Sequence, residues 1–286
     1  MRSKSIHLIA SAAVLLSAAL GCNLPYGGAP AATAPVAGSA GSAGSARPNE
    51  TSAPAGVAVS FSGTSFTIPA GLATGAAPES VPAMDNEPVP SWELAPAFVQ
   101  FTLQNYPVAG SLLKPMIWVY PAGKYEAVNN GAAESLKRLR ALISGGGMDV
   151  NGQTAPFVPS FNATQSFVAQ AMPIKFQNGA GIRMVTQYDQ APIPVNNHEL
   201  VYHFEGLTSD GANYVIVVFP INAATLPADG NPASPVPAGG IPFNQDDPAA
   251  YFAAVSQSLN QAAPASFTPS LTALDALVES IGVVAP

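Results

Sequence analysis

The segment from Tyr26 to about Gly56 most limits what this chain can fold into. It is nearly all Ala, Gly, Ser, Pro and Thr, and residues 38–46 read GSAGSAGSA. Such a segment has too little apolar side chain to offset the entropy lost on ordering it, so we expect a flexible tether. A chain of about thirty such residues spans roughly 30 Å on average. Any hydrophobic core must therefore come from residues 57–286, which we expect to form a single globular domain.

The residues before the tether have the three parts of a secretory signal peptide. Arg2 and Lys4 supply positive charge, residues 6–20 are almost wholly apolar, and Gly21 precedes the only cysteine of the chain. The apolar stretch is shorter than the ~20 residues that a membrane-spanning helix needs. We expect residues 1–21 to be removed during export.

The sequence Ala19-Leu20-Gly21-Cys22 resembles the lipobox of bacterial lipoproteins. The resemblance implies that Cys22 is acylated and becomes the new N-terminus, so that residues 22–56 form a lipid anchor and tether. Two acyl chains hold a protein stably on a bilayer, whereas one does so only marginally. The protein is then expected on the extracytoplasmic side of a membrane, at the cell surface or the outer membrane. The alternative is an ordinary secretory peptide that leaves Cys22 as a free thiol.

The charge balance argues against several classes of partner. The chain carries 10 Lys and Arg against 17 Asp and Glu, a net charge of −7. Proteins that bind nucleic acid or anionic lipid need a basic surface, and the only basic cluster is Lys137, Arg138 and Arg140. Its helical spacing indicates the solvated face of a helix. We expect no nucleic-acid partner.

The hydrophobic patterns of the body predict an α+β fold built on a mostly antiparallel sheet. Three pairs of apolar runs flank turn sequences and are expected to form hairpins, at residues 57–68, 174–188 and 198–219. Residues 98–104 and 116–120 add two more strands. The unbroken β-branched run Val215–Phe219 is the expected centre of the sheet.

About three helices are expected to pack on this sheet. Residues 130–143, with Asn130 as the cap, 248–259 and 268–281 each have apolar residues at helical spacing, and residues 161–172 form a further stretch of possible helix. Two proline-rich segments, 69–97 and 220–247, are expected to be long loops. Strands and helices do not alternate strictly, which argues against a doubly wound nucleotide-binding fold.

Outside the predicted signal peptide the chain contains only two histidines, and they are the main candidates for catalysis or metal binding. His198 and His203 are five residues apart, so on a regular strand they point to opposite faces and cannot share a metal ion. His203 shares a face with Glu199 and Glu205, but ligands on alternate residues lie ~6.6 Å apart, too far for one ion. We interpret these side chains as facing solvent. No motif for a hydrolase, a metal site or a phosphate-binding loop occurs, and no cofactor or metal is expected.

Aromatic residues interleaved with Asn and Gln suggest a surface that binds neutral ligands such as glycans. The candidate binding residues are Trp92, Tyr106 and Tyr125. Long loops on a rigid sheet often carry binding sites, so the loop pair 69–97 and 220–247 is the expected contact surface.

The predicted function is that of a membrane-anchored, non-catalytic interaction or scaffolding module at the cell envelope. Its expected partners are the lipid bilayer, through acylated Cys22, and an envelope protein or glycan. Two alternatives stay open: a lipoprotein that binds glycans or small ligands, and a hydrolase whose serine and histidine come together only in the fold. The body resembles the uncharacterised lipoproteins of bacteria and no characterised family, so the resemblance implies no catalytic residues.

Overall fold

The computed structural model describes residues 56–85, 88–147 and 155–284. Thr51–Pro286 forms one compact unit, distinct from Met1–Glu50. The predicted signal peptide, the predicted acylation site Cys22 and nearly all of the predicted tether lie outside the described residues.

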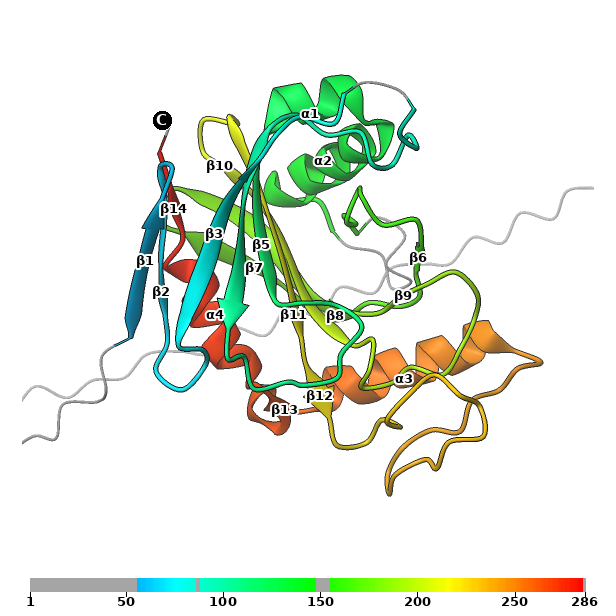
Figure 1. The fold of residues 1–286 in the computed structure, drawn as a ribbon. Helices are drawn as coiled ribbons and strands as arrows, with labels where there is room; N and C mark the ends of the chain where they lie inside the picture. Colours follow the sequence, from blue (N-terminus) through cyan, green and yellow to red (C-terminus); the bar gives the residue numbers. More distant parts are fainter. Residues whose placement is uncertain (1–55, 86–87, 148–154, 285–286) are drawn as a thin grey trace, which may run out of the picture. The chain divides into compact units, whose positions relative to one another are not determined.

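Seven strands form one antiparallel sheet in the order β3-β4-β5-β11-β10-β8-β7 (Figure 1). In that order they span Gly75–Val81, Phe98–Gln104, Met116–Pro121, Asn213–Pro220, Val201–Thr208, Gly179–Thr186 and Ala169–Phe176. The predicted α+β fold on a mostly antiparallel sheet is confirmed. The three predicted hairpins are present as β1 (Val57–Phe61) with β2 (Thr64–Ile68), β7 with β8, and β10 with β11.

Strand β11 is the middle strand of the seven, as its sequence predicts. Val215, Val217 and Phe219 pack into one hydrophobic core, and Tyr214 and Ile216 pack into a second core on the opposite face. Because successive side chains of a strand point to opposite faces, a strand covered on both sides must be apolar throughout.

Two helices cover one face of the sheet. Helix α2 (Asn130–Ile143) buries Leu136 and Leu139 against β8 and β10. Its cap is Asn129, whose side chain accepts a hydrogen bond from the backbone N–H of Ala132 at 3.0 Å, so the prediction of Asn130 as the cap is wrong by one residue. Helix α1 (Ala122–Val128), which precedes it, was not predicted and brings the number of α-helices in the described residues to four.

The other face is covered by α3 (Pro248–Gln261), α4 (Leu271–Glu279) and a small sheet. The small sheet has the order β1-β2-β14, with strands Val57–Phe61, Thr64–Ile68 and Gly282–Val283. Arg183 on β8 is 2% exposed and pairs with Asp275 of α4, with Nε to Oδ1 at 3.2 Å. Tyr202 also donates to Asp275, at 2.9 Å. Polar side chains thus fix α4 to the sheet.

Three expectations about irregular segments are wrong. Residues 161–172 form no helix: they contain β6 (Thr164–Gln165), which pairs with β9 (Tyr188–Asp189), and the first residues of β7. The expected loop 69–97 contains the edge strand β3, which accommodates Pro78 because it lies at the edge. The expected loop 220–247 contains β12 (Asn222–Ala223), paired with β13 (Phe267–Thr268).

A short 3₁₀ helix, Pro264–Ser266, follows α3. None of the helices in the described residues has the length and apolarity that crossing a membrane would require.

Candidate functional site

The three predicted binding residues do not form one surface. Trp92 is 38% exposed, and its segment is tied to the start of α2, because the Asn129 amide donates to the carbonyls of Trp92 and Leu94 at 3.2 and 2.9 Å. Tyr106 is half-buried and donates to the carbonyl of Pro220 at 2.9 Å. Tyr125 is fully buried and stacks on Tyr120, with 4.3 Å between ring centroids. The prediction for Tyr125 is wrong because α1 turns it inward.

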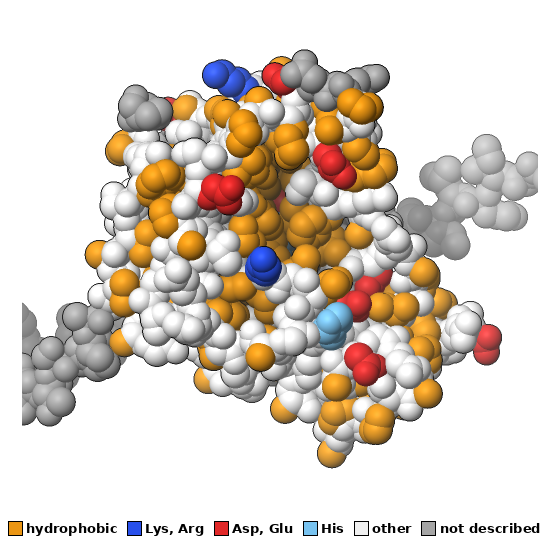
Figure 2. Space-filling model, viewed as in Figure 1, with side chains coloured by type: hydrophobic (Ala, Val, Ile, Leu, Met, Phe, Trp, Pro, Cys, Tyr) orange, Lys and Arg blue, Asp and Glu red, His pale blue; other side chains and the backbone are white. Residues whose placement is uncertain are grey.

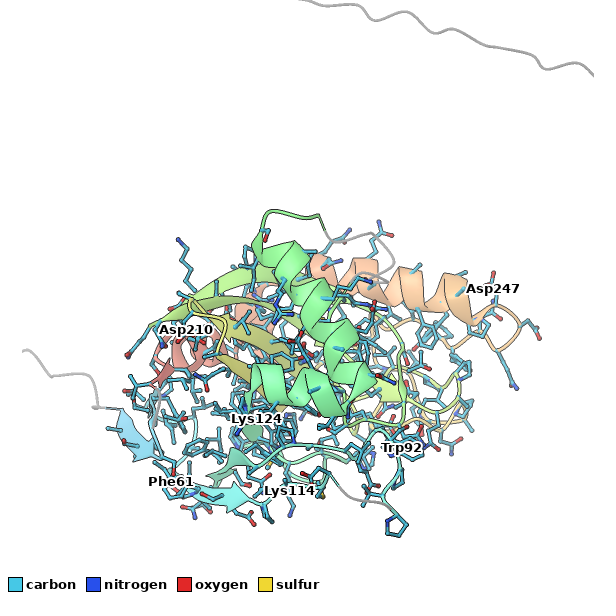
Figure 3. All side chains as sticks on the ribbon, turned by 90° about the horizontal axis from the view of Figure 1, so that it is seen from above. Phe61, Trp92, Lys114, Lys124, Asp210 and Asp247 are labelled. Carbon is cyan, nitrogen blue, oxygen red and sulfur yellow. The ribbon has the colours of Figure 1, made fainter. Side chains whose placement is uncertain are left out.

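The two proline-rich segments also lie apart. In Figure 1 the segment before β4 runs beside α1 and α2, whereas residues 220–247 lie below α3 at the opposite end of the body. Asn197 holds the latter segment, donating to the carbonyls of Ala223 and Leu226 at 3.2 and 3.1 Å. Figure 3 places Trp92 at the periphery. The two segments therefore cannot form the single contact surface expected from the sequence.

The two histidines have different environments. His198 lies in the turn before β10 and is half-buried, with Nδ1 3.9 Å from Glu199 Oε1. His203 and Glu205 are completely buried. The expectation that they face solvent is wrong, because α2 packs over this face of β10.

His203 and Glu205 belong to a buried polar network that joins four elements. Glu205 Oε1 lies 2.9 Å from His203 Nε2, although the approach departs from the line of a straight hydrogen bond. Glu205 Oε2 accepts from the hydroxyl of Ser135 on α2 at 2.8 Å and from that of Tyr214 on β11. On the other side, His203 Nδ1 lies 2.9 Å from the Tyr188 hydroxyl. We refer to these five residues as the buried network.

The proton positions in the network follow from its surroundings. Burial, reinforced by the negative charge of Glu205, raises the pKa of the Tyr188 and Tyr214 hydroxyls well above 10. Both hydroxyls therefore keep their protons. When Tyr188 donates to His203 Nδ1, the Nε2 nitrogen of the imidazole carries a proton that faces the Glu205 carboxylate. The imidazole and the carboxylate are both completely buried, so the network ties β10 to α2, β9 and β11 within the core.

Tyr188 links the buried network to an open cavity. Its hydroxyl points inward, while its ring forms part of the wall of a groove of about 490 Å³, which we call the Tyr188 groove. Figure 2 shows that this face is hollowed and that hydrophobic side chains prevail in the hollow. The groove is lined by Leu112, Leu113, Phe161, Asn162, Ala163, Tyr188, Asp189, Gln190, Ala191, Ile193 and Glu199.

Two carboxylates of the groove are positioned by neutral hydrogen-bond donors. The side-chain amide of Gln187 donates to both oxygens of Asp189, at 3.1 and 2.9 Å, and the Ser166 hydroxyl also donates to Asp189. The amide of Asn196 donates to Glu199 Oε2 at 2.7 Å. Burial raises the pKa of Asp189 above its ordinary 3.8, the charge of Glu199 adds to the increase, and the hydrogen bonds oppose it.

A larger groove of about 970 Å³ runs along α3, but its lining has fewer side chains that could bind or react with a charged ligand. Its lining, which includes Phe252, Ser256 and Asn260, contains no titratable side chain. Among the described residues no group of three or more His, Cys, Asp or Glu is placed to hold a metal ion. The Tyr188 groove is therefore the better candidate for a functional site.

Sequence patterns did not indicate this groove. The spacing of Glu199 pairs it with His203 and not with Asp189, and Asp189 ends a strand pair without any motif around it. The one available signal is the polar segment after β9, where Asn196 and Asn197 follow two prolines. Comparisons of the chain with protein-family models, with curated proteins and with solved structures find no match.

Proposed function

We propose that the protein is a membrane-tethered binding module that captures a small organic ligand in the Tyr188 groove. One observation carries the proposal: an apolar cavity contains two carboxylates that are already held by hydrogen bonds from within the protein. Ligand sites are typically apolar clefts of ~300–1,000 Å³ with a few placed polar groups.

The walls of the groove are supported by rigid parts of the fold. The Tyr188 ring is held because its hydroxyl contacts His203, and its strand β9 pairs with β6. The segment after β9 is fastened by Gln187, whose side-chain oxygen accepts from the backbone N–H of Asn196 at 3.0 Å. A preformed site loses less entropy when a ligand binds, so this support favours binding.

The sequence features at the N-terminus supply the cellular context of the proposal. Acylation of Cys22 would hold the chain on a bilayer, and the Ala, Gly, Ser and Pro tether would let the body reach ligands beyond the membrane surface. A protein with this arrangement is suited to capturing or presenting a ligand at the envelope. The non-catalytic role is supported by the inward-facing hydroxyl of Tyr188 and by the burial of His203.

The proposal is tested by blocking the groove. Ala191 lines the groove and is exposed, so Ala191→Trp should fill it while the body stays folded. Ala253→Trp is the matched control, because Ala253 is exposed in the larger groove along α3. A library of small organic molecules is screened by ligand-observed NMR against both variants and the wild type.

We expect molecules that bind the wild type and Ala253→Trp but not Ala191→Trp. If bound molecules are lost only from Ala253→Trp, the groove along α3 is the site and our assignment is wrong. Binding that neither substitution changes would also contradict it.

A further inference from the structure

From the charges in the Tyr188 groove we infer that its ligand is an organic cation, an ammonium group carried on an apolar body. This inference rests on the proposed function, and it names the chemical class of ligand for the same site. Three features of the groove support it: the sign of its charge, the hydrogen bonds that hold its carboxylates, and its apolar wall.

The groove carries negative charge that no basic side chain in its lining balances. Asp189 and Glu199 both line it, and none of the lining residues is Lys, Arg or His. Among the described residues Asp189 forms no ion pair, and Glu199 has a single approach to a basic group, 3.9 Å from His198, whose side chain is 41% exposed. Lys114 follows Leu113 in the chain but is exposed and is not part of the lining (Figure 3).

The carboxylates are arranged to receive a further donor. Gln187, Ser166 and Asn196 hold them through neutral donors, which fix the oxygens but leave the negative charge uncompensated. Asp189 is 7% exposed and the Glu199 side chain 17%, so both are partly withdrawn from water. A charge in such a position gains more from an opposite charge than it would in bulk water.

The apolar wall accounts for the rest of the ligand. Leu113, Ile193 and two aromatic rings line the groove beside the carboxylates. Phe161 and Tyr188 meet edge to face, with centroids 5.1 Å apart and planes at 88°. Aromatic ring faces attract ammonium groups, and the aliphatic side chains favour a hydrocarbon body. An anion would be repelled, and a neutral sugar would leave both carboxylates desolvated without a counter-charge.

Three probes of similar shape test this inference on the full chain: phenethylammonium, 2-phenylethanol and phenylacetate. They share a phenyl ring and a short side chain, and they differ in charge. Affinities are measured by ligand-observed NMR titration at pH 7 and fixed ionic strength. We expect phenethylammonium to bind at least about tenfold more tightly than 2-phenylethanol, as a hydrogen bond to a charged group provides, and phenylacetate to bind most weakly.

Two variants identify the source of the preference. Asp189→Asn and Glu199→Gln should each reduce the cation preference by about threefold or more. Glu199→Gln also covers the case in which the more buried Asp189→Asn does not fold. Glu93→Gln is the matched control, since Glu93 is an exposed carboxylate outside the groove. It should leave the preference unchanged.

The outcomes separate this inference from the proposed function. If the three probes bind equally and Ala191→Trp abolishes their binding, the groove binds ligands but the cation inference is wrong. If Glu93→Gln reduces the preference for the cationic probe as much as Glu199→Gln does, the preference comes from the net charge of the chain. That result would also overturn the inference. If no probe binds and the library yields no molecule sensitive to Ala191→Trp, both proposals fail.

Discussion

Replacing Glu205 by Gln should destabilise the protein strongly, although the two side chains have nearly the same shape. Glu205 is fully buried, receives hydrogen bonds from Ser135 and Tyr214, and has Oε1 2.9 Å from His203 Nε2. Glutamine keeps one oxygen but puts an amide donor where the second carboxylate oxygen was. At least one of the facing donors then meets another donor and loses its charged acceptor.

The size of the effect follows from these contacts. A buried polar group left without a partner costs about 1–3 kcal/mol, and a lost hydrogen bond to a charged group costs about 1.5–3 kcal/mol more. We expect Glu205→Gln to lower the free energy of unfolding by about 3–5 kcal/mol. The free energy of unfolding falls by about 2–3 kcal/mol per molar urea for a protein of this size, so the unfolding midpoint should fall by about 1–2 M urea.

The measurement is urea unfolding of the purified protein followed by tryptophan fluorescence. The control is Glu126→Gln, which removes a carboxylate from the surface pair with Arg140 and should cost at most about 1 kcal/mol. Replacing both His203 and Glu205 by leucine should cost less than the two single replacements summed, because the pair is removed together. A Glu205→Gln midpoint that equals that of Glu126→Gln would refute the argument that the network is a closed set of buried partners.

Three other changes test separate parts of the molecule. Leu274 is fully buried in α4, so Leu274→Ala should lower the free energy of unfolding by about 2–5 kcal/mol; a melting temperature within a degree of wild type would show that α4 is peripheral. Cys22→Ser should move the protein from the membrane to the soluble fraction on detergent partitioning, and retention in the membrane would contradict lipid anchoring. Asp189→Asn should lose stability relative to the wild type as pH is lowered from 7 towards 3.8, measured by urea midpoints. The raised pKa means that the folded state binds the Asp189 proton more tightly than the unfolded chain. The wild type therefore gains stability as pH falls through the raised pKa towards 3.8, a gain that Asn cannot make; a stability difference between the two proteins that is independent of pH would contradict this.

Elements whose pattern depends only on their own residues were predictable. Strand β11 reads as central because Val215–Phe219 is apolar at every position, and such a run is stable only when both faces are covered. Helix α2 was predictable because its apolar residues recur at helical spacing between a capping asparagine and a glycine. The β7–β8 hairpin was predictable in the same local way from Asn178-Gly179, although its turn lies one residue earlier, at Gln177 and Asn178, because Gly179 pairs with Phe176.

Elements decided by their neighbours were not predictable. Residues 75–81 include a proline and two alanines, and they form β3 only because β4 offers a free edge for pairing. Helix α1 has only seven residues, too few for a periodic pattern to stand out, and it follows β5 directly. Residues 161–172 looked helical by composition, but β9 provides a strand partner for Thr164 and Gln165.

The same distinction explains the candidate site. The alternation rule correctly put His203 and Glu205 on one face of β10, yet the rule says nothing about what covers that face. Ser135 on a helix, Tyr214 on a strand and Tyr188 after a hairpin each look ordinary alone, and they satisfy the buried pair only when the fold brings them together.

The buried pair of His203 and Glu205 couples the groove wall to the core, because residues from three other elements hold it in place. Tyr188 is the one member of the buried network that also lines the Tyr188 groove, and the next residue along, Asp189, carries one of its two carboxylates. A change that disturbs Glu205 should therefore move the imidazole, release the Tyr188 hydroxyl and loosen the ring that forms the groove wall. Ligand affinity should then fall in Glu205→Gln even at urea concentrations where the variant is fully folded, whereas Leu274→Ala, equally destabilising but on the opposite face of the sheet, should leave affinity unchanged.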